Sequence, residues 1–240
     1  MSPRMERLNM TADSNTTVRR RRFVQWLLAP VVVITIALGW KYPVLGFAVP
    51  VVMIAGMVGG IFRGRYVCGN LCPRGSFFDR VMPKLSLNRR IPEIFRKMAF
   101  RRALLVLLII FMVYRISRDP TDVMHWGHVF WLMCVITTGI GIVLGVFINP
   151  RSWCSFCPVG TVQNVLGRGK HSLQIDEELC RECRVCEKAC PFGLAIAEFK
   201  DDGVMSDPDC LKCSECIAAC PQSALSWRSE EEALRPAGKS

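Results

Sequence analysis

Four long apolar runs alternate with basic segments over most of the chain. A helix needs about 20 predominantly apolar residues to cross the hydrocarbon of a bilayer. The pattern therefore predicts four membrane-spanning helices. The third is short because arginines flank it, so it must tilt, thin the bilayer or let the arginines snorkel. The runs are Phe23–Trp40, Pro43–Phe62, Ala103–Tyr114 with its flanks, and Val129–Ile148.

Lysine and arginine concentrate on one side of the predicted membrane. Segment 63–102 holds eleven of them, and four consecutive arginines, 19–22, precede the first run. The two opposite connections contribute only Lys41, Arg115 and Arg118. Because positively charged loops stay in the cytoplasm, both chain ends are expected to be cytoplasmic.

The arginines before the first run have a second interpretation. Thr17–Val24 resembles a twin-arginine export signal. No convincing small-residue cleavage site follows it, and three further apolar runs come after. We therefore interpret the arginines as a topology anchor and expect the polar residues before Arg19 to be disordered.

Two copies of one cysteine string lie near the C-terminus. Both read C-x2-C-x2-C-x3-C-P, the spacing of two-cluster ferredoxins, in which three cysteines of one copy and the fourth of the other hold each [4Fe–4S] cube. Zinc is the alternative, but it typically takes two separated C-x2-C pairs. The spacing assigns cluster I to Cys180, Cys183, Cys186 and Cys220, and cluster II to Cys210, Cys213, Cys216 and Cys190.

Short strands are expected around these strings. Ser172–Ile175 is predicted as one strand, and Ala195–Phe199 and Val204–Ser206 as a hairpin turning at Asp202-Gly203. The predicted fold class is a membrane all-α four-helix core with an appended small α+β double [4Fe–4S] ferredoxin-like domain. The core covers 23–167 and the appended domain 168–228, between a basic N-terminus, 1–22, and a tail, 229–240.

Net charge separates these two parts. The chain carries +11, whereas 171–228 has eleven acidic and six basic residues and so carries −5, which leaves +16 for the rest. The basic residues bracket apolar runs rather than interleave with aromatic residues on a polar surface. A lipid bilayer therefore explains them better than nucleic acid, which we exclude as a partner.

A second cysteine motif follows the second and the fourth apolar run. Each copy has Arg-x2-Cys and then Cys-Pro-x-Gly-Ser/Thr, so the chain repeats a helical hairpin plus motif. We expect Ser76 and Thr161 to cap short helices, with Asp79 three residues after the first. If the copies adjoin, four thiols converge at the bilayer surface as ligands of a possible third cluster; a zinc site, redox-active dithiols and simple packing remain open. The four are Cys68, Cys72, Cys154 and Cys157.

With these motifs the chain resembles the NapH/MauN family of membrane iron–sulfur proteins, from about Phe23 to Trp227. The resemblance implies an electron-transfer subunit of a quinol dehydrogenase complex in a bacterial inner membrane. It also implies quinol and other redox subunits, ferredoxin-like or cytochrome, as partners. The chain departs from the family at Cys154 and Cys157, which are one residue closer than the usual C-x3-C-P.

The outer connection holds the remaining polar candidates. His125 and His128 lie near Asp122 and could contact a quinol head group, or could be ordinary loop residues in an aromatic belt. Neither falls in the middle of a run, so a haem inside the bilayer is not expected. Cys134 lies within the fourth run and is interpreted as a small apolar residue.

The predicted function is exchange of electrons between the quinone pool and a partner redox protein through iron–sulfur clusters. No nucleotide-binding glycine motif or nucleophile and base pair occurs, so catalytic residues are not assigned. Two alternatives remain. One is an electron donor for maturation of a metallocofactor enzyme, and the other is a membrane anchor whose partner performs the quinone chemistry.

Overall fold

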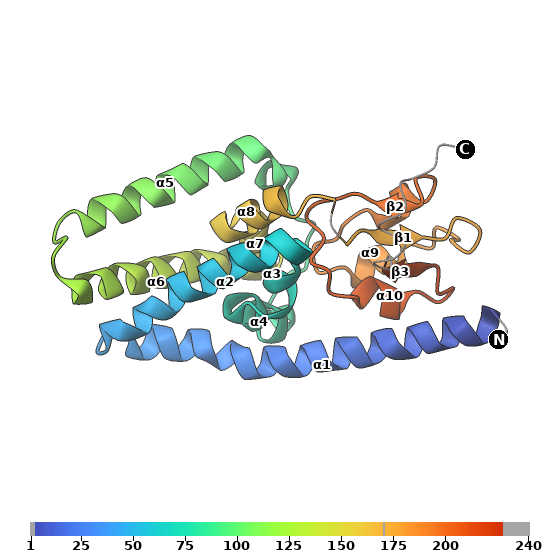
Figure 1. Ribbon diagram of the computed structural model, residues 1–240, viewed down its shortest axis with the longest axis horizontal. Coiled ribbons are helices and arrows are strands. Elements are labelled where there is room, and N and C mark those ends of the chain that lie inside the picture. The colour runs from blue at the N-terminus through green and yellow to red at the C-terminus, as the bar shows by residue number, and fades with distance from the viewer. Residues whose placement is uncertain (1–2, 170, 228–240) are drawn as a thin grey trace.

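The computed structural model describes residues 3–169 and 171–227. The molecule is elongated, with long helices at one end and a small sheet with short helices at the other (Figure 1). The first helix, α1 (Pro3–Leu38), runs along both parts. The two parts therefore share one continuous element from the start of the chain.

Three of the four predicted spans are found as helices long and apolar enough to cross a membrane. They are Ser14–Leu38 within α1, Pro43–Arg63, formed by η1 (Pro43–Phe47) and α2 (Ala48–Arg63), and α6 (Val123–Phe147). Many of their large apolar side chains are exposed, as expected for helices that face lipid. The protein is therefore membrane-associated.

The third predicted span forms helix α5 (Met98–Ile116) but is not among these three candidates. Its apolar part is short because Arg101, Arg102 and Arg115 lie near its ends. Arg101 does not snorkel to solvent, since it is buried and paired with Asp209 of the sheet domain. A core of four spans thus remains a prediction.

The N-terminal segment differs from the expected disorder. Helix α1 has 36 residues and is about 54 Å long at 1.5 Å per residue, well beyond the roughly 30 Å of hydrocarbon. One face is buried at three- and four-residue intervals from Ser14 onward, through Ser14, Val18, Arg21 and Gln25, so tertiary contacts support the helix well before Arg19. The boundary expected at residue 22 therefore lies inside a helix.

Short helices follow each long hairpin in the same order. After α2 come α3 (Tyr66–Asn70), α4 (Pro73–Arg80) and η2 (Met82–Lys84); after α6 come α7 (Ser152–Phe156) and α8 (Pro158–Leu166). Another short helix, η3 (Glu93–Arg96), precedes α5. Helix α4 packs along α1, and α8 packs along α2.

The helix caps in these motifs differ from the prediction. The N-caps of α4 and α8 are Cys72 and Cys157, and proline is the first helical residue of each. Proline begins these helices because its fixed φ suits the first turn and it has no N–H to leave unpaired. Ser76 and Thr161 lie inside the helices, so neither is a cap.

Glycines in the spans contact these short helices. A Cβ on Gly56 or Gly60 would lie 2.9 Å from Gln163 of α8, and one on Gly141 would lie 2.5 Å from Phe78 of α4. Gln163 is fully buried and donates to the Gly56 carbonyl at 2.6 Å. Glycine at these positions therefore allows the short helices to pack closely against the spans, whereas Gly139 has no neighbour within 4 Å.

The sheet domain is small and antiparallel, with strand order β2-β1-β3. Leu173 of β1 pairs with Met205 of β2 on one side and with Trp227 of β3 on the other. The elements are β1 (Leu173–Ile175), α9 (Val185–Ala189), η4 (Ile196–Phe199), β2 (Val204–Met205), α10 (Glu215–Ala219) and β3 (Leu225–Trp227).

Two strand predictions are corrected here. Ala195–Phe199 is mostly the 3-10 helix η4, and β2 pairs with β1 rather than with that segment. Strand β3 was not predicted. Both differences arise because strands this short are defined by their tertiary partners rather than by local preference.

Candidate metal centres

The two C-x2-C-x2-C strings form loops with the same unusual backbone. Two residues in each loop have left-handed φ angles: Glu182 (51°) and Arg184 (56°) in the first, Lys212 (54°) and Ser214 (61°) in the second. Such residues turn successive backbone amides toward one side of the chain. Arg184 and Ser214 then serve as N-caps of α9 and α10.

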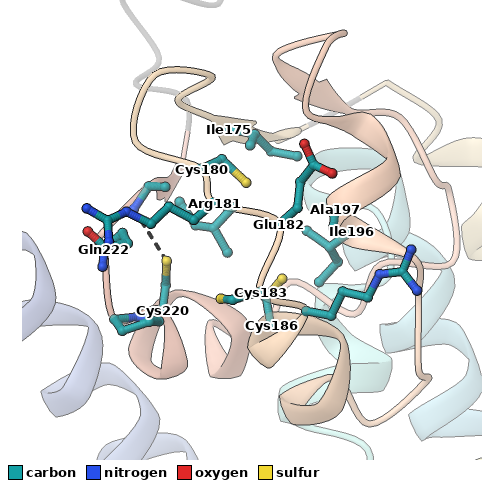
Figure 2. A pocket seen from close by; sticks show the side chains of 14 residues that line it. Ile175, Cys180, Arg181, Glu182, Cys183, Cys186, Ile196, Ala197, Cys220 and Gln222 are labelled. Atoms are coloured by element: carbon teal, nitrogen blue, oxygen red, sulfur yellow. Dashed lines mark hydrogen bonds between the residues drawn. The ribbon is translucent and has the colours of Figure 1, made fainter.

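The first group of thiols surrounds a cavity of the sheet domain. The sulfur atoms of Cys180, Cys183, Cys186 and Cys220 border a shared space (Figure 2). The amide of Ala224 donates to the sulfur of Cys220 at 3.4 Å. Burial raises the pKa of Cys186 to about 11, although the amide of the next residue partly offsets it. The structure thus brings together the four residues that spacing assigned to cluster I.

The second group surrounds a more enclosed cavity. Cys210, Cys213 and Cys216 are buried, and Cys190 of the other string completes the lining. Burial raises the pKa of Cys213 to about 12, while Arg21 of α1 acts in the opposite direction. These four are the residues assigned to cluster II. Burial is the main cause of the raised pKa of Cys216, followed by repulsion from the other thiols of its own group. Repulsion from Cys186 of the first group adds to these effects, so the two groups lie next to each other.

The donor set and the backbone fit [4Fe–4S] cubes. Each cavity has four thiols, and backbone amides of the loops hydrogen-bond to several of them. Inward amides in left-handed turns are typical of sites for anionic iron–sulfur clusters. A left-handed conformation costs about 1–3 kcal/mol for each of these residues. Both loops adopt it at the same positions relative to their cysteines.

The Arg-x2-Cys motifs interlock at the membrane edge. Arg65 of the first donates to the carbonyl of Cys154 in the second at 2.6 Å, and Arg151 of the second donates to that of Cys68 in the first at 3.1 Å. The glycine of each Cys-Pro-x-Gly motif makes room for the opposite arginine. A Cβ on Gly75 would lie 2.8 Å from Arg151, and one on Gly160 would lie 2.5 Å from Arg65.

The different cysteine spacing does not disturb this symmetry. The amide of Cys72 donates to the carbonyl of Val67, and that of Cys157 donates to the carbonyl of Trp153. The additional residue, Leu71, sits in the turn between α3 and Cys72 with its side chain exposed. Both second cysteines therefore reach the same place, directly before a helix-starting proline.

Cys68, Cys72, Cys154 and Cys157 come together. Cys68 is close enough to the other three for repulsion to add to burial in raising its pKa. Burial likewise raises the pKa of Cys72 and of Cys154, and nearby arginines act against it. Because a thiol must lose its proton to bind metal, these cations favour the ligating form.

The membrane-edge thiols also contact the sheet domain. Cys68 and Cys154 pack against the apolar core that contains Cys210, Cys213 and Cys216. A Cβ on Gly69, next to Cys68, would lie 2.3 Å from the carbonyl of Leu211. Gly69 therefore brings the first membrane-edge motif into direct contact with the loop of the second cavity.

Within 3–169 and 171–227, no three His, Cys, Asp or Glu side chains converge closely enough to hold a single metal ion. One tetrahedral zinc draws its thiolates to about 3.8 Å from one another, given Zn–S bonds of about 2.3 Å. Ligands of a cube bind four different iron atoms and stand farther apart. The two kinds of site therefore differ in how far apart they hold their thiolates.

Asp209 joins the sheet domain to both repeats. Its carboxylate accepts from Arg101 at 2.9 and 2.5 Å, from Arg65 at 2.6 Å and from Asn164 at 2.7 Å, with Arg96 at 3.4 Å. Burial alone would raise the pKa of Asp209, but the arginines outweigh it and lower the pKa to about 2. The carboxylate is therefore charged at neutral pH, directly beside Cys210.

Asp79 and Glu215 form the corresponding connection with α1. Asp79 accepts from Arg151, Arg21 and Gln25, and Arg21 also donates to Glu215 at 2.7 Å. Burial would raise the pKa of Asp79, but Arg151 and Arg21 outweigh it, so the pKa is lowered. Asp79 is thus the centre of an ion-pair network rather than part of a helix cap.

The role of these acidic residues was not predicted. A signal existed in the comparison of the two cysteine strings. Asp209 and Glu215 directly precede Cys210 and Cys216, whereas the matching positions of the first string are Leu179 and Val185. At these two positions, acidic residues therefore occur only in the second string, which contacts the membrane-edge helices. The Arg-x2-Cys motif includes the arginines, but it does not indicate which acidic residues pair with them.

The candidates of the outer connection have structural contacts. Asp122 caps α6 by accepting from the amide of Met124 at 2.8 Å. A ring nitrogen of His125 lies 2.9 Å from the carbonyl of Arg115, and His128 packs edge-on against Trp131. These contacts favour the interpretation as ordinary loop and helix-end residues.

Cys134 has an unexpected neighbour. Its sulfur, buried within α6, accepts a hydrogen bond from Arg74 of α4 at 3.5 Å. Cys134 is therefore more than a packing residue, since it solvates a guanidinium that stands next to Cys72 and Cys157.

Comparison with known families matches the repeat and the cysteine strings separately. A 4Fe–4S binding domain matches twice, over 45–92 and 128–175, and each match contains one Cys-Pro motif. A 4Fe–4S dicluster domain matches 172–221, which contains both cysteine strings. The two matches to the same domain confirm a repeat of apolar helix plus Cys-Pro motif, and neither match includes the first helix of its hairpin.

Three relatives match parts of the chain. Two uncharacterised proteins of Methanocaldococcus jannaschii are 28% identical over 179 residues (72% of this chain, 68% of the relative) and 25% identical over 188 residues (70% and 73%). One component of the ion-translocating oxidoreductase complex of Methanosarcina acetivorans is 36% identical over 62 residues, 25% of this chain and 23% of that component. No solved structure matches significantly. With its apolar helices, the chain is a membrane-associated iron–sulfur protein of electron transfer.

Proposed function

We propose that this chain exchanges electrons between the quinone pool and a partner redox protein, as a subunit of a quinol dehydrogenase complex. One observation carries the proposal. The membrane-edge thiols lie between the apolar helices and the second thiol cavity, and the second cavity adjoins the first. Three thiol groups thus form a row that leads away from the bilayer.

The proposed ligands follow this row. Cluster I would be held by Cys180, Cys183, Cys186 and Cys220, and cluster II by Cys190, Cys210, Cys213 and Cys216. Cys68, Cys72, Cys154 and Cys157 would hold a third cluster. When bound, such clusters supply one-electron transfer without a change in the protein's covalent structure.

The surrounding residues adjust the chemistry of these sites. Arg65, Arg74 and Arg151 lie beside the membrane-edge thiols, and their positive charge favours the reduced form of a cluster there. That charge matters because ferredoxin-type clusters are often too reducing to accept electrons from quinol. The acid partners Asp79 and Asp209 hold two of these arginines in position.

A quinol site near the cytoplasmic edge suits this arrangement. A site at the outer face would require electrons to cross about 30 Å of hydrocarbon with no carrier in the spans. The outer residues Asp122 and His125 are also engaged in structural contacts. We therefore place quinol oxidation beside α4 and α8, at the cytoplasmic side of an inner membrane that the chain crosses several times.

The test uses proteoliposomes that contain the intact, anaerobically purified chain and no partner. A quinol of low potential should bleach the broad visible absorbance of the clusters. Replacing Cys72 or Cys154 with serine should weaken this bleaching, because both belong to the thiol group nearest the bilayer. Cys134→Ser is the matched control and should retain the bleaching, because Cys134 belongs to no thiol group and serine keeps an acceptor for Arg74.

Dithionite separates the proposal from its alternative. Full bleaching by dithionite with no response to any quinol would contradict quinol oxidation by this chain. It would instead assign the chain an anchoring role, with the quinone chemistry in a partner subunit.

A further inference from the structure

A large cavity lies between the membrane-edge motifs and the sheet domain. Its volume is about 560 Å³, within the range of about 300–1,000 Å³ that small-molecule sites occupy. One wall is formed by Asn149–Arg151, directly after the apolar helix α6, and another by α9 and the residues that follow it. The cavity therefore lies beside a candidate span and also beside Cys190.

The lining is strongly basic. Five of its cations form no ion pair with any residue in the described parts of the chain, 3–169 and 171–227. They come from three separate segments, so no single helix accounts for them. The five are Arg80, Arg89, Arg90, Arg184 and Lys188.

The acids that face the cavity are already engaged. Asp79 is held by Arg21 and Arg151, and Glu215 is held by Arg21 and Arg22. The third, Glu187, accepts from the amide of Ala197 at 3.2 Å. Glu187 keeps its charge, so seven cations and three carboxylates line the cavity, and the lining is net positive.

Arg80 shows the consequence most clearly. Its Nε is buried and has no hydrogen-bond partner. Burial lowers the pKa of Arg80, and the nearby charges of Arg21 and Arg22 lower it further against the opposing effect of Asp79. Only this atom is buried, and the side chain as a whole is partly exposed, so its other donors remain open to a ligand in the cavity.

We propose that this cavity binds the phosphate group of an anionic ligand. Guanidinium groups suit phosphate because their donors form paired, charge-assisted hydrogen bonds with its oxygens. The volume accommodates more than a free phosphate, so the group would belong to a larger molecule. Two sources share this chemistry: the head group of an anionic phospholipid, which could enter beside α6, and a soluble phosphorylated metabolite.

The site has a consequence for electron transfer, which rests on the function proposed above. Cys190 lines both this cavity and the second thiol cavity. Negative charge beside a cluster disfavours its reduction. Bound phosphate would therefore lower the reduction potential at the cluster II position.

Binding is measured by calorimetry on the intact, cluster-loaded chain in neutral detergent, with inorganic pyrophosphate as the soluble probe. We expect saturable binding that weakens with added salt. In parallel, the chain is placed in nanodiscs of phosphatidylcholine with or without phosphatidylglycerol, and retained lipid is counted by native mass spectrometry. Pyrophosphate binding indicates a soluble ligand, and retained phosphatidylglycerol without it indicates a lipid; either supports the site.

The variants compare two pairs of neighbouring exposed arginines on the same side of the membrane. The double variant R89Q/R90Q should weaken binding by about tenfold or more, as expected for the loss of about 1.4 kcal/mol. The control R19Q/R20Q removes the same charge from α1 outside the cavity and should bind as the unmodified chain does. R80Q should also weaken binding.

Two results would overturn the site: no saturable binding of either probe, or equal weakening in R19Q/R20Q and R89Q/R90Q. The measurements need no electron transfer. Failure of the quinol experiment would therefore leave this inference standing, and failure here would leave the proposed function standing.

Discussion

Arg151 donates two hydrogen bonds to the carboxylate of Asp79, from Nε at 2.7 Å and from Nη2 at 2.6 Å. The two side chains are 1% and 6% exposed, so the pair is buried. It connects the second Cys-Pro motif with the helix that follows the first, and Arg21 extends the connection to α1. The two repeats and the N-terminal helix are therefore held together at one carboxylate.

The substitution Asp79→Asn should strongly destabilise the protein. It leaves the buried guanidiniums of Arg151 and Arg21 without their counter-ion, which costs about 3–5 kcal/mol. For a chain of this size the midpoint of thermal unfolding in detergent should fall by roughly 10 °C. Asp202→Asn, in an exposed turn, is the control and should leave the midpoint unchanged. Equal midpoints for the two variants would show that the pair contributes little.

Replacing Gly75 or Gly160 with alanine should push apart the two Arg-x2-Cys motifs and destabilise the protein. The new methyl group would lie 2.8 Å from Arg151 or 2.5 Å from Arg65, and those arginines are buried and cannot turn aside freely. Such overpacking costs about 1–3 kcal/mol and should lower the thermal midpoint. Gly139→Ala, where no atom lies within 4 Å, should be neutral or stabilising because alanine favours helix. A similar loss at all three positions would point to glycine flexibility instead.

Iron content should distinguish two clusters from three. Each [4Fe–4S] cluster adds four irons, so the intact chain should carry about twelve irons when the third site is filled and about eight when it is not. Cys68→Ser or Cys157→Ser should remove about four irons and leave the electron paramagnetic resonance signals of the other clusters. Cys134→Ser should retain all irons. An unchanged iron content in Cys68→Ser and Cys157→Ser would exclude the third cluster.

Membrane topology should follow the charge distribution. A reporter that is active only outside the cytoplasm should be active when it is fused after Asp122, and inactive when it is fused after Ser240. The structure adds a reason, because α1 packs against α10 and thereby places the start of the chain on the side of the sheet domain. Activity of the fusion after Ser240 would revive the interpretation of Thr17–Val24 as an export signal.

The eight cysteines of the two strings could be grouped from spacing. Three thiols at fixed short intervals reach only neighbouring corners of a cube, so the fourth must come from the other string. The cavities lined by Cys220 with the first string and by Cys190 with the second show the same grouping. Three spans were likewise predictable, because crossing a membrane depends on length and hydropathy alone.

The partners of the charged residues depended on the tertiary structure. Arg65, Arg151 and Asp209 are far apart in sequence, and a charge pattern does not reveal which residue will neutralise which. The expected disorder before Arg19 was wrong for the same reason. A polar segment forms an ordered helix when one of its faces is buried, as Ser14 and Val18 are in α1, and Asp79 and Glu215 hold the following turn through Arg21.

Local pattern therefore determined the composition of each site, and the fold determined how the sites are joined. Cysteine spacing and the length of an apolar run are local features of the sequence. They can be read without knowing how the rest of the chain folds. The meeting of Cys68 and Cys154 with the Cys210 core, and the basic cavity beside Cys190, require four distant segments to pack together. Such packing is decided by long-range burial and charge pairing, which only the folded chain shows.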